Sequence, residues 1–437
     1  MNLLRKSSNW TLGICMIVMT FISINMKWNG EDWRTVIASD SKGYYSYLPA
    51  VFIYDDPNFG FFETIEKEKY YNENTFTDYR SLGNGKIINK YYIGTATAEL
   101  PFFLIGHGIA KSTSWDNDGY SKPYMLVLCV SALFYLFIGA LFVQKTLRRF
   151  GIDERSISWI TVAGIFGTNL FYYVVVEAGT SHVYSFAFIS MLIYYYHCWV
   201  HEKKSRHLFL LAFLFGMILI IRPVNALVFL ALPFVAGSWN SFLTSIVDIL
   251  KKKWIGVLAL VLFVLVLFIQ LGYYKWAAGS WLVYSYREEG FDFTDPHFFD
   301  MLFSYRKGLF LYTPMYLLAF IGLVVLWKKQ EHFRVFSWSA FFLVLTYILS
   351  SWWMWYYGGS FSSRVYVDYL PFFLLLLGIG FHHWRKGWTG WTLRIVTVLL
   401  ILLCQIQVYQ YRYGQIHVSD TTKEQYWSNF LRIDKLM

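Results

Sequence analysis

The sequence predicts an all-α protein embedded in a membrane, with about eleven transmembrane helices. Of its 437 residues, 56% are hydrophobic and only 15% are charged, whereas soluble domains average roughly 25% charged residues. The apolar residues form separate stretches, most of them close to the roughly 20 residues that a helix needs to cross a bilayer. The basic residues gather in alternate connections between these stretches. Together these observations favour a polytopic membrane protein over a soluble fold.

The apolar stretches give the order of the predicted helices. The first, 10–27, is not followed by a signal-peptide cleavage site, and we expect it to remain as the first helix. The stretch 93–110 is short and contains Glu99 and Pro101, so we expect it to lie at the interface or to re-enter rather than to span. Two stretches flank Arg222-Pro223, and one broken helix is the alternative there. The predicted crossings are 10–27, 122–143, 157–175, 182–200, 207–222, 224–240, 254–274, 308–327, 335–353, 367–384 and 393–411.

The basic residues test this count through the rule that cytoplasmic loops carry the excess of Lys and Arg. With a cytoplasmic N-terminus, every dense basic cluster falls inside; counting 93–110 as a crossing would invert them all. The prediction is one transmembrane domain, 1–411, with a long first extracytoplasmic loop, 28–121, that carries amphipathic interfacial helices. The tail 412–437 is then extracytoplasmic. The clusters are Lys145–Arg155, Lys203–Arg206, Lys251–Lys253, Lys328–Arg334 and Arg385–Arg394.

The net charge and the positions of the cysteines bear on nucleic-acid binding, disulfides and metal sites. The net charge of +10 is explained by the cytoplasmic loops, so we expect no nucleic-acid partner. The four cysteines lie inside apolar runs without C-x-x-C spacing, which predicts buried free thiols rather than disulfides or a zinc site. They are Cys15, Cys129, Cys198 and Cys404.

Acidic and histidine candidates lie where the predicted topology places the outer surface. Asp40 follows the first helix in SDSKGYYSYLP, which also contains Tyr44. The alternative role for this aspartate is to cap a helix. Glu177 and His182 lie in VVVEAGTSHVYSF at a tight turn between two helices. Ionisable groups at such depth suggest function, although a satisfied structural pair is the alternative.

Cationic candidates lie on the same predicted side. Lys90 in NKYYIGTATAELPFF is either an anchor at the interface or an anion contact. Arg222 lies at the outer end of an apolar stretch and needs an acidic side chain or a phosphate to compensate its charge. Arg306 and Lys307 occur in LFSYRKGLFLYTP. In WYYGGSFSSRVYVDYLP, a Gly-Gly turn leads to Arg364 at a helix start, a combination that suits phosphate.

This combination of acidic and cationic side chains suits the transfer of a sugar from a lipid phosphate. The leaving phosphate is already a stable anion, so it needs cations rather than an acid, while the acceptor hydroxyl needs one general base. Asp40 together with Arg222, Arg306 and Arg364 matches that requirement. Because all the candidates gather on one predicted side, we expect them to form one site.

The motifs, in this order, resemble the GT-C superfamily of membrane glycosyltransferases, particularly the branch of protein O-mannosyltransferases and aminoarabinose transferases. The resemblance spans most of residues 10–371. It implies that Asp40 is the catalytic base, that the donor is a polyprenyl-phosphate sugar and that transfer inverts the anomeric centre. It also implies a bacterial inner membrane, with the site facing the periplasm and a glycan, lipid or protein as acceptor.

The sequence departs from that family at one point. Related enzymes often have Asp-Glu in the first loop, whereas Ser41 follows the aspartate here. A second acid is therefore unassigned, with Asp55, Asp56 and Glu99 as candidates. No cofactor is assigned; a divalent metal is possible but not supported.

Three other classes are compatible with a cationic site at a membrane surface. A transporter or flippase for an anionic lipid-linked sugar would use the same cations but should show inverted repeats, and the sequence has none. A non-catalytic assembly protein of the cell envelope needs no carboxylate at the cations. A ligase or polymerase of the O-antigen type needs a large outer loop late in the chain, whereas the largest loop here is the first.

Overall fold

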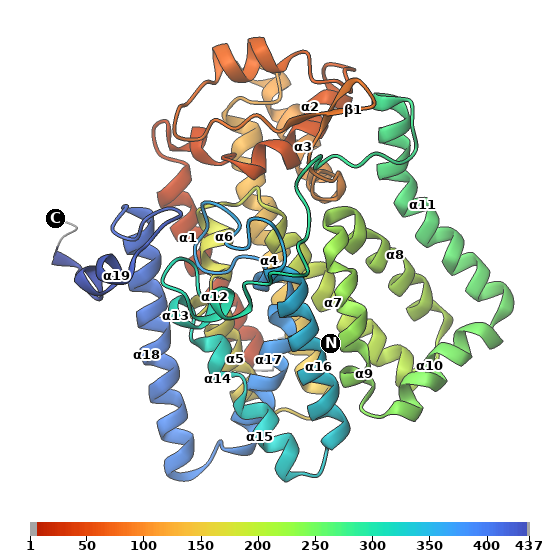
Figure 1. The fold of residues 1–437 in the computed structure, drawn as a ribbon, viewed down its shortest axis with the longest axis vertical. Coiled ribbons are helices and arrows are strands. Elements are labelled where there is room, and N and C mark those ends of the chain that lie inside the picture. Colours follow the sequence, from red (N-terminus) through yellow and green to blue (C-terminus); the bar gives the residue numbers. More distant parts are fainter. Residues whose placement is uncertain (1–6, 435–437) are drawn as a thin grey trace.

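The computed structural model describes residues 7–434, which form a predominantly helical chain (Figure 1). Its first half contains α1 (Ser7–Lys27), η1 (Asp32–Thr35), α2 (Asp40–Phe52), η2 (Glu63–Lys69), β1 (Arg80–Gly83), β2 (Lys86–Asn89), α3 (Gly94–Ser112), α4 (Lys122–Arg149), α5 (Glu154–Phe166), α6 (Leu170–Val175), α7 (Ser181–Glu202) and α8 (Ser205–Ile221). Its second half contains η3 (Pro223–Ala231), α9 (Leu232–Ala236), α10 (Trp239–Lys251), α11 (Lys253–Ala278), α12 (Phe298–Phe303), α13 (Leu309–Tyr312), α14 (Met315–Leu318), α15 (Ile321–Lys328), α16 (His332–Ser350), α17 (Tyr366–His383), α18 (Gly387–Arg412) and α19 (Lys423–Asn429).

The predicted first outer loop contains the only sheet among residues 7–434. Strands β1 and β2 pair antiparallel, with Arg80 opposite Asn89 and Gly83 opposite Lys86. Asn84 and Gly85 connect them with positive φ angles of 51° and 76°, as a two-residue hairpin turn requires. The all-α prediction is therefore corrected by this hairpin, while α2 and the short helices η1 and η2 occupy the rest of the segment before it.

The predicted count of eleven crossings is not confirmed. In the described part of the chain, six helices are long and apolar enough to cross a membrane, and a seventh crossing arises if the pair 223–236 and 239–251, bent by 119°, is one broken span. The six are α1, α4, α7, α11, α16 and α18. α3, predicted as a non-spanning segment, is not among them.

Chain breaks explain most of the difference. The predicted crossing 224–240 begins as the 3₁₀ helix η3 and continues as the five-residue α9. The predicted crossing 308–327 is divided into α13, α14 and α15, with Pro314 at the first division. The predicted crossing 157–175 is divided into α5 and α6 at Gly167. Mean hydropathy follows composition and does not detect such interruptions, so it overestimated the number of continuous helices.

The fold places two ends of the molecule far apart. Helix α2 and the β hairpin lie at one end, and the connections α15–α16 and α17–α18 lie at the other (Figure 1). Helix α17 is buried along nearly its whole length and runs through the interior, so its two ends are fixed points of the structure. Arg364 lies just before its N-terminus. The four cysteines are buried free thiols.

Candidate active site

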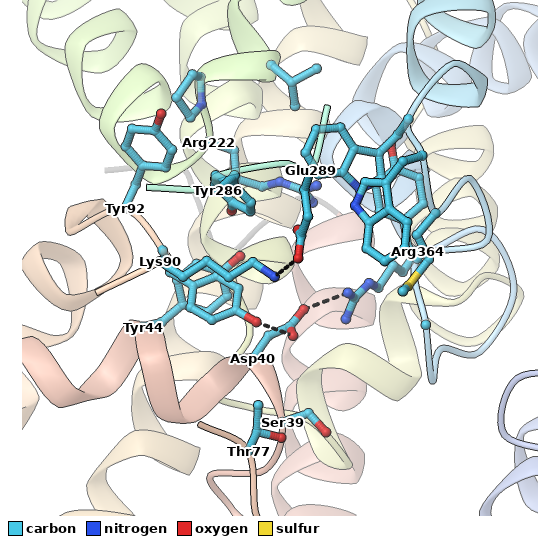
Figure 2. A pocket seen from close by; sticks show the side chains of 18 of the residues that line it. Ser39, Asp40, Tyr44, Thr77, Lys90, Tyr92, Arg222, Tyr286, Glu289 and Arg364 are labelled. Atoms are coloured by element: carbon cyan, nitrogen blue, oxygen red, sulfur yellow. Dashed lines mark hydrogen bonds and ion pairs between the residues drawn. The ribbon is translucent and has the colours of Figure 1, made fainter. Parts of the chain in front are cut away.

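A cavity of ≈ 610 Å³ lies where six segments meet, and two ion pairs and a hydrogen bond to Asp40 are drawn inside it in Figure 2. The segments are the start of α2, the residues before β1, the residues after β2, the turn after α8, the loop between α11 and α12, and the loop between α16 and α17. The last two pair with each other through the Trp353 amide, which donates to the Gly290 carbonyl at 2.9 Å, and through the Asp292 amide, which donates to the Ser351 carbonyl at 2.7 Å. The side chains that line the cavity include Ser39, Asp40, Tyr44, Thr77, Lys90, Tyr91, Tyr92, Arg222, Tyr284, Tyr286, Glu289, Phe291, Trp352, Trp353, Tyr357 and Arg364.

Asp40 is held by contacts from two distant segments. Its Oδ2 accepts a hydrogen bond from Arg364 Nη2 at 2.6 Å, and its Oδ1 accepts one from Tyr91 Oη at 2.7 Å. The carboxylate is half-buried, with 23% of the side chain exposed. Burial raises the pKa of Asp40, but the charge of Arg364 and the bonds from Tyr91 and Arg364 outweigh it, so the pKa lies below its ordinary value. Asp40 is therefore ionised at neutral pH.

The alternative role of a helix cap receives no direct support from these contacts. Helix α2 begins at Asp40, and Ser39 precedes it without a side-chain cap hydrogen bond. Both carboxylate oxygens of Asp40 instead face groups that are 51 and 324 residues away in the chain. The side chain is thus directed into the cavity rather than back along its own helix.

A glycine allows Tyr91 to approach α2. A Cβ atom at Gly43 would lie 2.1 Å from Tyr91 Cδ2, much closer than any real contact. Any other residue at this position would push the Tyr91 ring away, and the hydrogen bond from Tyr91 Oη to Asp40 would be lost. Close packing of the Tyr91 ring therefore explains the glycine at position 43 in the SDSKGYYSYLP motif.

Lys90 lines the cavity as one half of an ion pair. Its Nζ lies 2.5 Å from Glu289 Oε1 in the loop after α11, and both side chains are about one quarter exposed. Its Nζ is also 5.4 Å from the ring centroid of Tyr286. The pair joins two opposite walls of the cavity (Figure 2).

Arg222 has the compensating acid that its position required, and it is Asp368. Arg222 Nη1 lies 3.5 Å from Asp368 Oδ2, while His182 Nδ1 lies 2.7 Å from Asp368 Oδ1. Asn225 Nδ2 donates to Asp368 Oδ2 at 2.8 Å. Arg222 still lines the cavity, whereas His182 lies behind it in this buried polar cluster.

Arg306 and Lys307 do not line the cavity but bind the C-terminal tail. Arg306 pairs with Asp420 and donates from Nε to the Ser419 carbonyl at 2.9 Å. Lys307 is buried, and its ammonium donates to the carbonyls of Ser360 and Val418. Burial lowers the pKa of Lys307 to about 7. The predicted contact of Arg306 with phosphate, and the candidacy of Lys307 as a site residue, remain predictions.

The other acidic candidates lie outside the cavity lining. Glu177 accepts a hydrogen bond from Tyr172 Oη at 3.0 Å, and burial raises its pKa. Asp56 accepts bonds from the amides of Asn58 and Gly60 in a turn. Asp55 is exposed in that turn, and Glu99 is buried within α3. Among the described residues, the second carboxylate in the cavity is Glu289, which the sequence did not single out.

Aromatic rings form much of the cavity wall. Tyr44 and Tyr91 lie 4.9 Å apart between ring centroids, and Tyr286 packs edge-on against Trp352 at 5.7 Å. Residues 7–434 contain no group of three or more His, Cys, Asp or Glu side chains placed to hold a metal ion. The cavity combines two carboxylates, Asp40 beside Arg364 and Glu289 beside Lys90, with three cations and a set of aromatic faces.

Comparison with known proteins gives structural similarities at low sequence identity. No protein-family model and no curated protein sequence matches the chain. The solved structures with similarity include the apo form of the Archaeoglobus fulgidus oligosaccharyltransferase, with a TM-score of 0.46 and 11% identity over 96% of this chain and 57% of that chain. They also include AglB of the same organism with an inhibitory peptide and a dolichol-phosphate, with a TM-score of 0.45 and 10% identity over the same shares. This chain spans little more than half the length of those proteins, and similarity at this level does not assign it to a family.

Proposed function

We propose that the chain is an integral-membrane glycosyltransferase that moves a sugar from a polyprenyl-phosphate donor to a hydroxyl of a glycan, lipid or protein, with inversion. The single observation that carries this proposal is the ionised Asp40 carboxylate, held beside Arg364 and near Lys90 and Arg222 in one aromatic-lined cavity. A base, a set of cations and flat apolar faces are the groups that an acceptor hydroxyl, a phosphate and a sugar ring respectively need.

The proposed reaction uses each of these groups once. The acceptor oxygen attacks the anomeric carbon and its proton passes to Asp40. The bond from that carbon to the phosphate oxygen breaks on the opposite face, and its electron pair leaves with the phosphate. Arg364, assisted by Arg222 and Lys90, stabilises that anion. Attack opposite to departure inverts the anomeric centre.

The ion pair between Asp40 and Arg364 predicts that the donor binds before Asp40 becomes an effective base. Arg364 occupies one carboxylate oxygen and holds the pKa of Asp40 low, which makes Asp40 a weak base. A donor phosphate competes for the same guanidinium. When Arg364 turns to the phosphate, the carboxylate loses a cationic neighbour and its basicity rises. Donor binding therefore prepares Asp40 for the acceptor.

Mass spectrometry of a deletion strain tests the proposed function. Envelope glycans and lipid A should lose one sugar substituent, and the corresponding polyprenyl-phosphate sugar should accumulate. Unchanged glycans together with an unchanged lipid-linked pool would reject a glycosyltransferase.

An assay with purified protein in detergent separates transfer from transport, because no membrane divides two compartments. The protein should release polyprenyl phosphate from a lipid extract of the deletion strain when the acceptor fraction of that strain is added. A transporter or flippase would release none.

A further inference from the structure

A second cavity lies beyond the other end of α17 from Arg364. Its volume is ≈ 200 Å³, and it opens between the start of α5 and the connection from α17 to α18. The 18 residues of α17 rise about 27 Å at about 1.5 Å per residue. That separation approaches the ~30 Å of a bilayer's hydrocarbon core. In Figure 1 this connection lies at the lower end, away from α2 and β1.

Basic side chains dominate this second cavity. Four of them line it, against one carboxylate, that of Asp153. Asp153 is already engaged, since Oδ2 contacts Ser156 Oγ at 2.7 Å and His382 Nδ1 at 2.9 Å. No other acid among residues 7–434 lines the cavity, which therefore has an excess of positive charge. The four basic residues are Arg155, Arg385, Lys386 and Arg394.

The four cations divide into two that are fixed and two that are available. Arg385 Nη1 donates to the His382 carbonyl at 2.6 Å, and Arg394 Nη2 donates to the Arg385 carbonyl at 2.9 Å. These neutral carbonyls orient the guanidinium groups without cancelling their charge. Within residues 7–434, the exposed side chains of Arg155 and Lys386 have no hydrogen bond or ion pair.

Tryptophans place the cavity at the level of lipid headgroups. Trp159 and Trp384 line it, and Trp388 and Trp391 on the first turns of α18 are 85% and 63% exposed. Tryptophan is enriched at the interface between membrane and water, where an apolar ring and a polar edge are both satisfied. A soluble anion needs no such apolar rim, whereas the acyl chains beside a phosphate headgroup would contact it.

We propose that this cavity binds the phosphate headgroup of an anionic phospholipid, on the membrane face opposite to the candidate active site. Arg385 and Arg394 form the fixed part of the site, and Arg155 and Lys386 close on the phosphate. The volume accommodates a headgroup but is smaller than the roughly 300–1,000 Å³ of sites for larger ligands. Basic pockets between transmembrane helices suit anionic headgroups through charge and hydrogen bonding.

Native mass spectrometry of the full chain in detergent tests the proposal, with phosphatidylglycerol and phosphatidylcholine as probes. Phosphatidylglycerol should bind in preference to phosphatidylcholine. The double variant Arg155→Gln/Lys386→Gln should weaken phosphatidylglycerol binding by about 30-fold, the equivalent of about 2 kcal/mol, because each Lys or Arg near an anionic surface contributes on the order of 1 kcal/mol. Thermal unfolding in phosphatidylcholine should stay unchanged, since neither side chain has a hydrogen bond or ion pair within residues 7–434.

A matched control removes the same charge elsewhere. Lys251 and Lys253 are also exposed and belong to another of the predicted cytoplasmic clusters, so Lys251→Gln/Lys253→Gln should retain the affinity for phosphatidylglycerol. Equal loss in both double variants would show general charge attraction and overturn the site. Displacement of bound phosphatidylglycerol by inorganic phosphate at a concentration equal to that of the lipid would identify a site for soluble anions and would equally overturn the lipid proposal. Neither result depends on the proposed transferase activity.

Discussion

Two loop segments carry arginines that the sequence predicted to hold the same phosphate, and the structure gives them different partners. Arg364, at the start of α17, faces the cavity and binds Asp40. Arg306, before α13, faces outward, pairs with Asp420 and packs its guanidinium 3.3 Å from the ring centroid of Tyr356. The ion pair of Arg364 is more buried, with 13% and 23% of the side chains exposed against 30% and 60%. A buried charge that a ligand can reach suits a binding role, whereas an exposed pair on a tail suits attachment.

The largest expected difference is between the two aspartates of these pairs. Asp40→Asn preserves the shape of the side chain but cannot accept a proton, so transfer should fall by roughly 10²–10⁴-fold. Asp420→Asn removes the same charge from the tail pair and should leave transfer unchanged. Glycan mass spectrometry of a deletion strain that expresses each variant at equal level measures both. Comparable activity of the two variants would contradict a catalytic role that belongs to Asp40 and not to Asp420.

The next effect separates the two arginines. Arg364→Ala removes a charge-assisted contact to phosphate worth about 1.5–3 kcal/mol, so donor use should fall by about tenfold or more. Arg306→Ala should leave donor use near the wild-type level. Initial rates at varied donor concentration, with the purified variants, provide the test. If Arg306→Ala lowers donor use as much as Arg364→Ala does, Arg306 also contacts the donor phosphate.

A smaller effect concerns pH. The low pKa of Asp40 means that its basic form persists across neutral pH and is lost only as pH falls through that pKa. Tyr91→Phe removes one hydrogen bond to the ionised carboxylate, so the acid limb of kcat/KM should move to higher pH by about one unit. Tyr92→Phe, a cavity residue without a bond to Asp40, should leave the acid limb in place. If both profiles coincide with the wild type, Tyr91 does not tune Asp40.

The smallest effect concerns the tail. Exposed ion pairs contribute roughly 0–1 kcal/mol, so Arg306→Ala should loosen residues 413–434 only slightly, and limited proteolysis of the tail should accelerate a few-fold at most. Cleavage elsewhere in the chain should stay unchanged. Complete loss of tail protection would mean that this one pair holds the tail, contrary to its exposure and to the separate bonds of Lys307.

The sequence identified several cavity residues because topology alone groups them. Asp40, Lys90, Arg222 and Arg364 each lie where a predicted outer loop meets a helix, and all four line the cavity. Arg306 satisfies the same criterion, and only the tertiary contact with the tail distinguishes it. Position along a helix predicts the end of the molecule at which a side chain lies but not the partner that it meets there.

The place of Glu289 in the cavity could not be predicted, because it depends on a contact between two loops that are distant in the sequence. Glu289 enters the cavity because the loop after α11 pairs with Ser351 and Trp353, some sixty residues away, and no periodicity reports such a pairing. In contrast, Asn84-Gly85 is a strong turn signal in the sequence, and the hairpin was predictable from it. Pro314 likewise marked the division of a predicted crossing.

Donor binding and transfer measured together in one sample test the central claim most directly. Purified Asp40→Asn protein, mixed with the lipid-linked sugar from the deletion strain, should show donor bound at nearly wild-type occupancy by native mass spectrometry. Addition of the acceptor fraction should then release almost no polyprenyl phosphate, because the cations remain but the base is gone. Release of polyprenyl phosphate at a rate close to that of the wild type would contradict the assignment of Asp40 as the base.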